Sequence, residues 1–242
     1  MNRERHRKNQ ERYRLRQKKL TNNLDHANQL LRDEIRYLKS QRNRLIIGIS
    51  PHITLQTVVM EYFRVFRHGF VDPDGSRIVE LDFLRASMSP DLDAGAVFGF
   101  EALARNWGIF SLFFRNVRVQ LEGMEQTGEN AVVAKTITSV TITTTSLREV
   151  FSYPGTVERE RWSKIVAKLL GQRLVMHGSV QFIWNSLTNR MEGLLSQSDM
   201  VTPLLQLLGS MEDVSVVLSK ARVTPEGNLV VGDYLSRYPS FS

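Results

Sequence analysis

Leucines at seven-residue intervals constrain the N-terminal part of this chain more than any other feature. They lie within residues 3–47, a stretch without proline or glycine, and are Leu24, Leu31, Leu38 and Leu45. A seven-residue apolar repeat keeps one side of a helix facing a partner helix. The same spacing occurs on the core stripe of ordinary globular helices, but here most other positions are polar and a basic segment directly precedes the leucines. The pattern predicts a long helix in a parallel, dimeric coiled coil.

The residues at the a position of each heptad indicate how many helices would associate and in which register. With the leucines at d, the a positions hold Thr21, Asn28, Ile35 and Arg42. A single asparagine at a favours two strands and one register, at a cost in stability. Because Thr21 and Arg42 are poor a residues, we expect a weak zipper that needs help from the rest of the chain.

Positive charge is concentrated before this zipper. Residues 1–49 contain 14 lysines and arginines against 5 acidic residues, whereas the remainder contains 18 basic and 20 acidic residues. On a helix, one face would carry His6, Asn9, Gln10, Tyr13 and Arg14. The flanks would carry Arg3, Arg5, Arg7, Lys8, Arg12, Arg16, Lys18 and Lys19. A charge run can be a solvated face or a localisation signal, but its phasing with the leucines favours a helix lying in the major groove of DNA.

This N-terminal arrangement resembles the basic leucine zipper (bZIP) transcription factors, in particular sequences of oomycete type. In that family an arginine is followed by nine residues and the first zipper leucine, as Arg14 is followed here by Leu24. The resemblance implies base contacts from His6, Asn9, Gln10, Tyr13 and Arg14, and backbone contacts from the flanking cations. His6 stands where the family has asparagine, which puts the target sequence in question more than DNA binding itself.

The remaining chain alternates between helical and strand patterns. An apolar helix face follows Ser50 and Pro51 and reaches Gly69, and residues 72–75 have turn composition. Residues 78–83 alternate as a strand does, whereas residues 98–114 favour a helix. We expect strands at 117–121, 131–145, 173–185 and 190–200, turns at 128–130 and 187–189, a partly helical excursion at 146–168, and a last helix at 201–208.

Helices followed by antiparallel strands predict an α+β domain, a curved antiparallel sheet wrapped by helices. The order resembles the SnoaL-like branch of the nuclear-transport-factor-two-like fold, in which a sheet and helices surround a conical pocket. That fold serves enzymes, ligand-binding modules and dimerisation modules alike. The expected domains are the bZIP segment (1–48), the regulatory or dimerisation domain (51–210) and a C-terminal extension (211–242).

Catalytic chemistry has little support in the sequence. The absence of cysteine excludes thiolate catalysis, disulfides, sulfur-ligated zinc and flavin adducts on a thiol. The acid or base candidates are His68, Asp82, His177 and Asp199, and their spacing implies no catalytic pair. No phosphate loop or hydrolase motif occurs, and we expect neither a metal nor another cofactor.

We therefore expect a dimeric, sequence-specific transcription regulator in the nucleus. Its partners would be double-stranded DNA and a second bZIP chain, identical or different, and its C-terminal domain could also hold a small apolar ligand; we expect no membrane association. Two alternatives stay open. One is a pocketed enzyme or ligand-binding protein whose basic helix serves assembly and nuclear localisation. The other is a dimerisation partner that binds DNA poorly because of His6.

Overall fold

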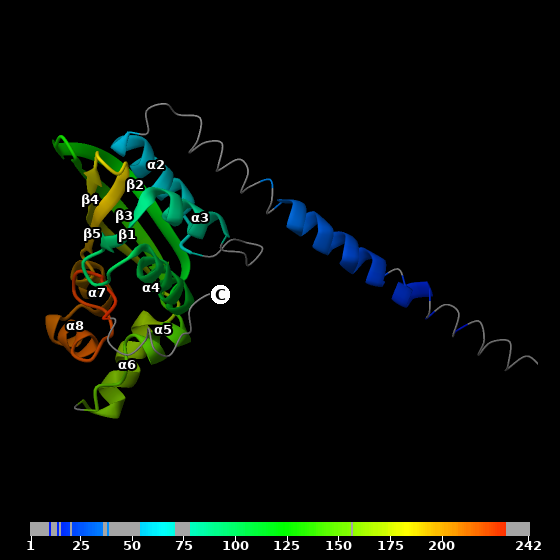
Figure 1. Ribbon diagram of the computed structural model, residues 1–242. Coiled ribbons are helices and arrows are strands. Elements are labelled where there is room, and N and C mark those ends of the chain that lie inside the picture. The colour runs from blue at the N-terminus through cyan, green and yellow to red at the C-terminus, as the bar shows by residue number, and fades with distance from the viewer. Residues whose placement is uncertain are drawn as a thin grey trace, which may run out of the picture. The chain divides into compact units, whose positions relative to one another are not determined.

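The computed structural model describes residues 10, 14, 16–19, 21–35, 38, 54–70, 78–155 and 157–230. The chain divides into two units, Met1–Ile46 and Ile47–Ser242. In the first unit residues 21–35 form a continuous helix (Figure 1). The predicted start of the next helix at Ser50 and Pro51, and the predicted turn at 72–75, lie outside the described residues.

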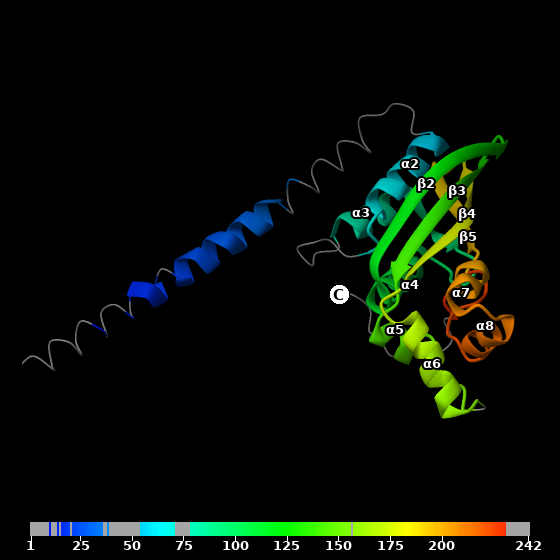
Figure 2. The ribbon, with the colours of Figure 1, turned by 180° about the vertical axis from the view of Figure 1, so that it is seen from behind.

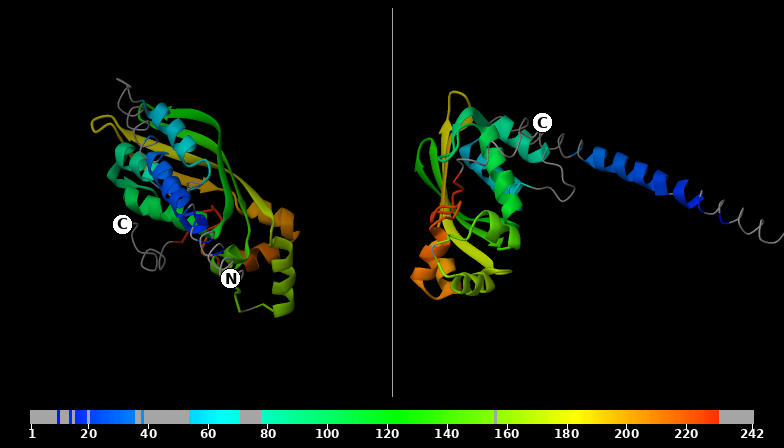
Figure 3. Two further views of the ribbon diagram at one scale, coloured as in Figure 1. Left: turned by 90° about the vertical axis from the view of Figure 1, so that its right-hand side faces the viewer. Right: turned by 90° about the horizontal axis from the view of Figure 1, so that it is seen from below.

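The second unit is built on a five-stranded sheet with the strand order β1-β5-β4-β3-β2. The strands are β1 (Met88–Asp93), β2 (Arg115–Gly128), β3 (Ala131–Thr141), β4 (Arg173–Asn185) and β5 (Arg190–Ser198). Neighbouring strands from β2 to β5 are antiparallel, whereas β1 pairs with β5 in parallel. The prediction of an α+β fold is confirmed, but the sheet is mixed and not antiparallel. Its long strands bend along their length (Figure 3).

Helices α2 (Leu55–Val65), α3 (Ile78–Ser87) and α4 (Phe100–Phe113) cover one face of this sheet (Figures 1 and 2). Thr54 caps α2, since its hydroxyl accepts a hydrogen bond from the backbone N–H of Thr57. The buried side of α2 then meets the sheet through aromatic rings, with the Tyr62 and Phe182 centroids 5.4 Å apart. This contact fixes α2 over the centre of the sheet.

Two segments differ from the sequence prediction. Residues 78–83, predicted as a strand, belong to α3, where Phe83 and Leu84 are buried and Phe83 lies 6.4 Å from Phe66 between ring centroids. Strand β1 was not expected, because its sequence Met-Ser-Pro-Asp-Leu-Asp has low strand propensity. It fits at the sheet edge, the position in which proline is tolerated.

Other elements agree with the prediction. The predicted helix at 98–114 is α4, the predicted hairpin is β4–β5, and the last predicted helix is α7 (Val201–Leu208). Strand β3 ends at Thr141, earlier than expected. Thr143 then forms a capping box with Ser146 and starts α5 (Thr144–Glu149), and α6 (Arg159–Leu169) follows in the predicted excursion.

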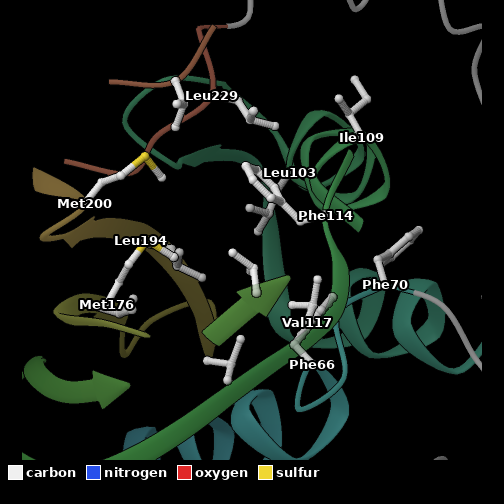
Figure 4. Packing of buried hydrophobic residues seen from close by; sticks show 14 of the residues in the cluster. Phe66, Phe70, Leu103, Ile109, Phe114, Val117, Met176, Leu194, Met200 and Leu229 are labelled. Carbon is white, nitrogen blue, oxygen red and sulfur yellow. The ribbon is translucent and has the colours of Figure 1, made fainter. Parts of the chain in front are cut away.

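The core extends into the residues after 210. Helix α8 (Met211–Leu218) and the segment that follows it bury Val214, Val217, Val223 and Leu229. Figure 4 shows Leu229 near core side chains from α4 and the sheet, including Leu103 and Leu194. Residues 211–230 are therefore part of the same packed unit. None of the helices in the described part of the chain combines the length and hydropathy needed to cross a membrane.

Candidate functional site

The N-terminal helix carries the described part of the predicted DNA-binding and zipper surface. Zipper positions 24, 28, 31 and 35 lie on one face of the helix at residues 21–35, and Leu38 is also helical. The apolar ones are about half exposed, with Leu24 at 56% and Ile35 at 48%. An apolar stripe this exposed is available to a partner helix.

The described residues of the basic segment are helical and exposed: Gln10, Arg14, Arg16, Lys18 and Lys19. The hydroxyl of Thr21 donates a hydrogen bond to the carbonyl of Gln17, one turn earlier. The other predicted DNA-contacting residues lie outside the described residues: Arg3, Arg5, His6, Arg7, Lys8, Asn9, Arg12 and Tyr13. The same holds for Leu45 of the zipper.

The second unit contains a cavity of about 100 Å³ between α2, α4, the inner face of the sheet and residues 227–229. Its apolar wall includes Phe63, Leu103, Phe110, Met176, Leu194 and Leu229. Its polar wall includes Asn106, Thr136, Thr138, Ser196, Ser198 and Asn228. Aromatic rings fill the space around it, as in the stacked pair Phe66 and Trp107, with centroids 5.3 Å apart. The volume is well below the ~300–1,000 Å³ of ordinary ligand pockets.

Two groups of the cavity wall stand out in their hydrogen bonding. The Tyr62 hydroxyl accepts a bond of 2.9 Å from the indole N–H of Trp107, and burial raises the pKa of Tyr62 well above its usual range. Asn106, one position before Trp107, has its Oδ1 buried without a hydrogen-bond partner among the described residues. A buried acceptor without a donor costs free energy. Within the described part of the chain, the amide oxygen of Asn106 is therefore an unsatisfied acceptor in this wall.

The predicted acid and base candidates are not brought together at this cavity. His68 is exposed after α2, and Asp82 lies in α3 with a carboxylate oxygen 3.8 Å from Arg85. His177 is on the other face of β4, 3.8 Å from Glu122, at an open groove that Asp199 also borders. Hydrogen bonds from the side chain and the backbone N–H of Thr202 in α7 to the Asp199 carboxylate lower the pKa of Asp199. Asp199 thus supports a helix start.

No aspartate, glutamate, histidine, lysine or arginine occurs among the described residues that line the cavity. Nor does any group of three or more potential metal ligands gather in the part of the chain that the structure describes. Sequence reasoning missed Tyr62, Asn106 and Trp107 as wall residues. The sequence indicates these wall residues only through helical spacing in α4, which places Leu103, Asn106, Trp107 and Phe110 on one helix face.

Comparison with known families gives a match within the second unit. Residues 57–113, which run from α2 through α4, match the family model of the bZIP transcription factor 1 C-terminal domain. A search of curated proteins gave no match. The matched segment supplies Tyr62, Asn106 and Trp107, so this part of the cavity wall lies inside it.

Several solved structures are similar to the second unit. A SnoaL-like polyketide cyclase from Agrobacterium tumefaciens has 14% identity and a TM-score of 0.46, over 64% of this chain and 99% of that one. A putative polyketide cyclase from Streptomyces antibioticus has 17% identity and a TM-score of 0.43, over 64% and 98% of the two chains. At this level of similarity no activity is assigned from these proteins to this chain.

Proposed function

We propose that this protein is a DNA-binding transcription regulator that acts in the nucleus as a bZIP-type dimer. The observation that carries the proposal is the match of residues 57–113 to the C-terminal domain of a bZIP transcription factor. It concerns a segment that contributes nothing to the bZIP pattern of residues 6–45, so the two indications are independent. The exposed stripe of Leu24, Leu31 and Ile35 supports the same proposal.

In the proposed complex the zipper holds two basic helices in opposite directions along the major groove. Arg16, Lys18 and Lys19 neutralise phosphates and set the position of the helix, whereas Gln10 and Arg14 reach base edges. His6, Asn9 and Tyr13 complete the base-reading face that the bZIP resemblance implies. The second zipper chain is either an identical copy or another bZIP protein.

The α+β unit acts in this proposal as a regulatory or assembly module and has no catalytic role. An enzyme would place an acid or base against its substrate. The wall of the cavity instead contributes amide and hydroxyl groups, and Tyr62 stays protonated because burial raises its pKa. Such neutral amide and hydroxyl groups are suited to binding a molecule and not to catalysing its conversion.

The proposal is tested by selecting duplexes from a random pool with the full-length protein and then measuring affinity by fluorescence anisotropy. Arg14→Ala should weaken binding to the selected duplex by about 1–3 kcal/mol and binding to a random duplex by less. The matched control is Arg67→Ala, which removes the same charge from an exposed position of the α+β unit.

Selection of no common sequence by the wild-type protein would contradict the proposal. So would an equal effect of Arg14→Ala and Arg67→Ala on the selected duplex. A His6→Asn variant carried through the same selection reports whether the histidine changes the preferred sequence. A changed preference assigns His6 to base reading, and an unchanged one assigns it to the backbone or solvent.

A further inference from the structure

We propose that the cavity of the α+β unit binds a small, uncharged molecule that is mostly apolar and carries one hydroxyl group, and that the side-chain amide of Asn106 recognises this hydroxyl. The inference concerns the α+β unit alone. It does not depend on DNA binding.

The size of the cavity limits the ligand. Its volume is about 100 Å³, and apolar protein cavities of about 150 Å³ admit benzene. A single ring exceeds this volume and is the upper limit only because the cavity is partly open to solvent, so that part of the ring lies in its mouth. The ring of Trp107, stacked on Phe66, and the neighbouring Tyr62 border this space between α2, α4 and the sheet, and the small volume disfavours polycyclic molecules.

The chemistry of the wall determines the charge of the ligand. A buried ion requires a partner of opposite charge, and no charged side chain is found among the described residues that line the cavity. The apolar wall formed by side chains such as Phe63, Leu103 and Leu194 favours a hydrocarbon surface. A neutral and mostly apolar molecule satisfies both conditions.

The side-chain amide of Asn106 is the reason to expect a hydroxyl group on the ligand. Its Oδ1 is buried without a hydrogen-bond partner among the described residues, and Asn106 lines the cavity. The terminal torsion of an asparagine is broad and roughly two-fold, so a half turn exchanges its oxygen and nitrogen. The amide can thus present an acceptor or a donor to the cavity, and a hydroxyl, which both donates and accepts, pairs with either.

Neighbouring contacts hold this wall in place. Trp107 directly follows Asn106 on α4, and its indole is fixed by the hydrogen bond to Tyr62 and by stacking on Phe66. A ligand would meet an ordered surface and lose little affinity to the ordering of side chains.

The test uses the full-length protein with phenol as the probe and toluene as its apolar counterpart, both titrated by calorimetry. Phenol should bind several-fold, up to about tenfold, more tightly than toluene, the range expected for one net hydrogen bond. Asn106→Leu should bring the two affinities together. Gln181→Leu, which removes an amide from β4 on the opposite face of the sheet, should leave the preference for phenol unchanged.

Ala94→Leu fills part of the cavity from its wall and should abolish binding of both probes. This variant, together with the wild-type comparison, keeps the test decisive even where Asn106→Leu does not fold. Equal affinities of the wild-type protein for phenol and toluene, or no binding of either, would overturn the proposal. A preference for phenol that persists in Asn106→Leu, or binding that persists in Ala94→Leu, would overturn it as well.

Discussion

The indole N–H of Trp107 donates a hydrogen bond to the hydroxyl oxygen of Tyr62, and this bond of 2.9 Å joins α4 to α2 across 45 positions of the chain. Tyr62 is only 2% exposed. The bond therefore satisfies two polar groups inside an aromatic cluster, and its removal leaves the indole N–H without an acceptor.

Tyr62→Phe should lower the free energy of unfolding at neutral pH by about 1–2 kcal/mol, because a buried donor loses its partner. Unfolding in urea measures the loss. The double variant Tyr62→Phe with Trp107→Phe provides the control, since it removes donor and acceptor together and should cost less than the sum of the single changes. If the losses of the two single variants simply add in the double variant, the hydrogen bond contributes nothing to stability.

The same residue predicts how stability changes in alkali. Burial raises the pKa of Tyr62 above its ordinary value of 10.0, so above that pH the unfolded chain ionises while the folded chain stays protonated. The contribution of the protonated Tyr62 side chain to the free energy of unfolding is complete well below pH 10. Above that pH it decreases by up to about 1.4 kcal/mol per pH unit. The stability difference between wild type and Tyr62→Phe should therefore narrow from about pH 9 to pH 11, and a constant difference would refute this account.

Asn106→Leu should raise the free energy of unfolding by about 1 kcal/mol in the absence of any added ligand. The change replaces a side chain whose amide oxygen is buried without a partner among the described residues by an apolar side chain of similar size, which removes a desolvation cost. Ser146→Ala is the contrasting variant, because the Ser146 hydroxyl is buried but donates a 2.6 Å bond to the carbonyl of Phe113. That change should destabilise by about 1 kcal/mol, and opposite signs in urea unfolding are the expected result.

Asn28→Leu should raise the thermal stability of the assembled protein and weaken its preference for dimers, because the amide at an a position penalises other oligomers. Sedimentation equilibrium of the full chain measures the oligomer distribution. Asn23→Leu is the matched control, since it makes the same change on the same helix one residue before Leu24, outside the a and d positions. A similar effect of both variants would place Asn28 outside the interface.

Lys18→Ala combined with Lys19→Ala should reduce the salt dependence of DNA binding. Each phosphate contact contributes about 0.9 to the slope of log affinity against log salt concentration. The slope should thus fall by up to about 1.8 if both side chains contact phosphates. The control, Arg67→Ala with Lys220→Ala, removes two exposed cations from the α+β unit and should leave the slope unchanged.

Local sequence patterns were sufficient for much of this fold. The apolar run Val201–Leu208 and the β4–β5 hairpin could be located because their periodicity and turn residues agree with their tertiary setting. The prediction of a strand at residues 78–83 was wrong for the opposite reason. Their alternation fits a strand, but packing of Phe83 and Leu84 against α2 and α4 stabilises a helix instead.

The cavity could not be foreseen from the sequence in this way. Its wall combines Tyr62, Asn106 and Leu229, which are far apart in the chain and share no motif. Leu229 in particular belongs to a segment that the sequence assigned to an extension, because a short apolar pattern between turns gives no sign of what it covers. The basic and zipper residues were easier to recognise, since their meaning lies in spacing along one helix.

The parallel pairing of β1 with β5 has a consequence for how the chain is made. Met88 lies beside Met191, so the edge strand meets its neighbour only after about 100 further residues have been synthesised. At translation rates of roughly 5–20 residues per second, β1 waits about 5–20 s before the residues of β5 that pair with it are made. During that interval β1 lacks its partner strand, and an unpaired strand edge favours aggregation of a nascent chain.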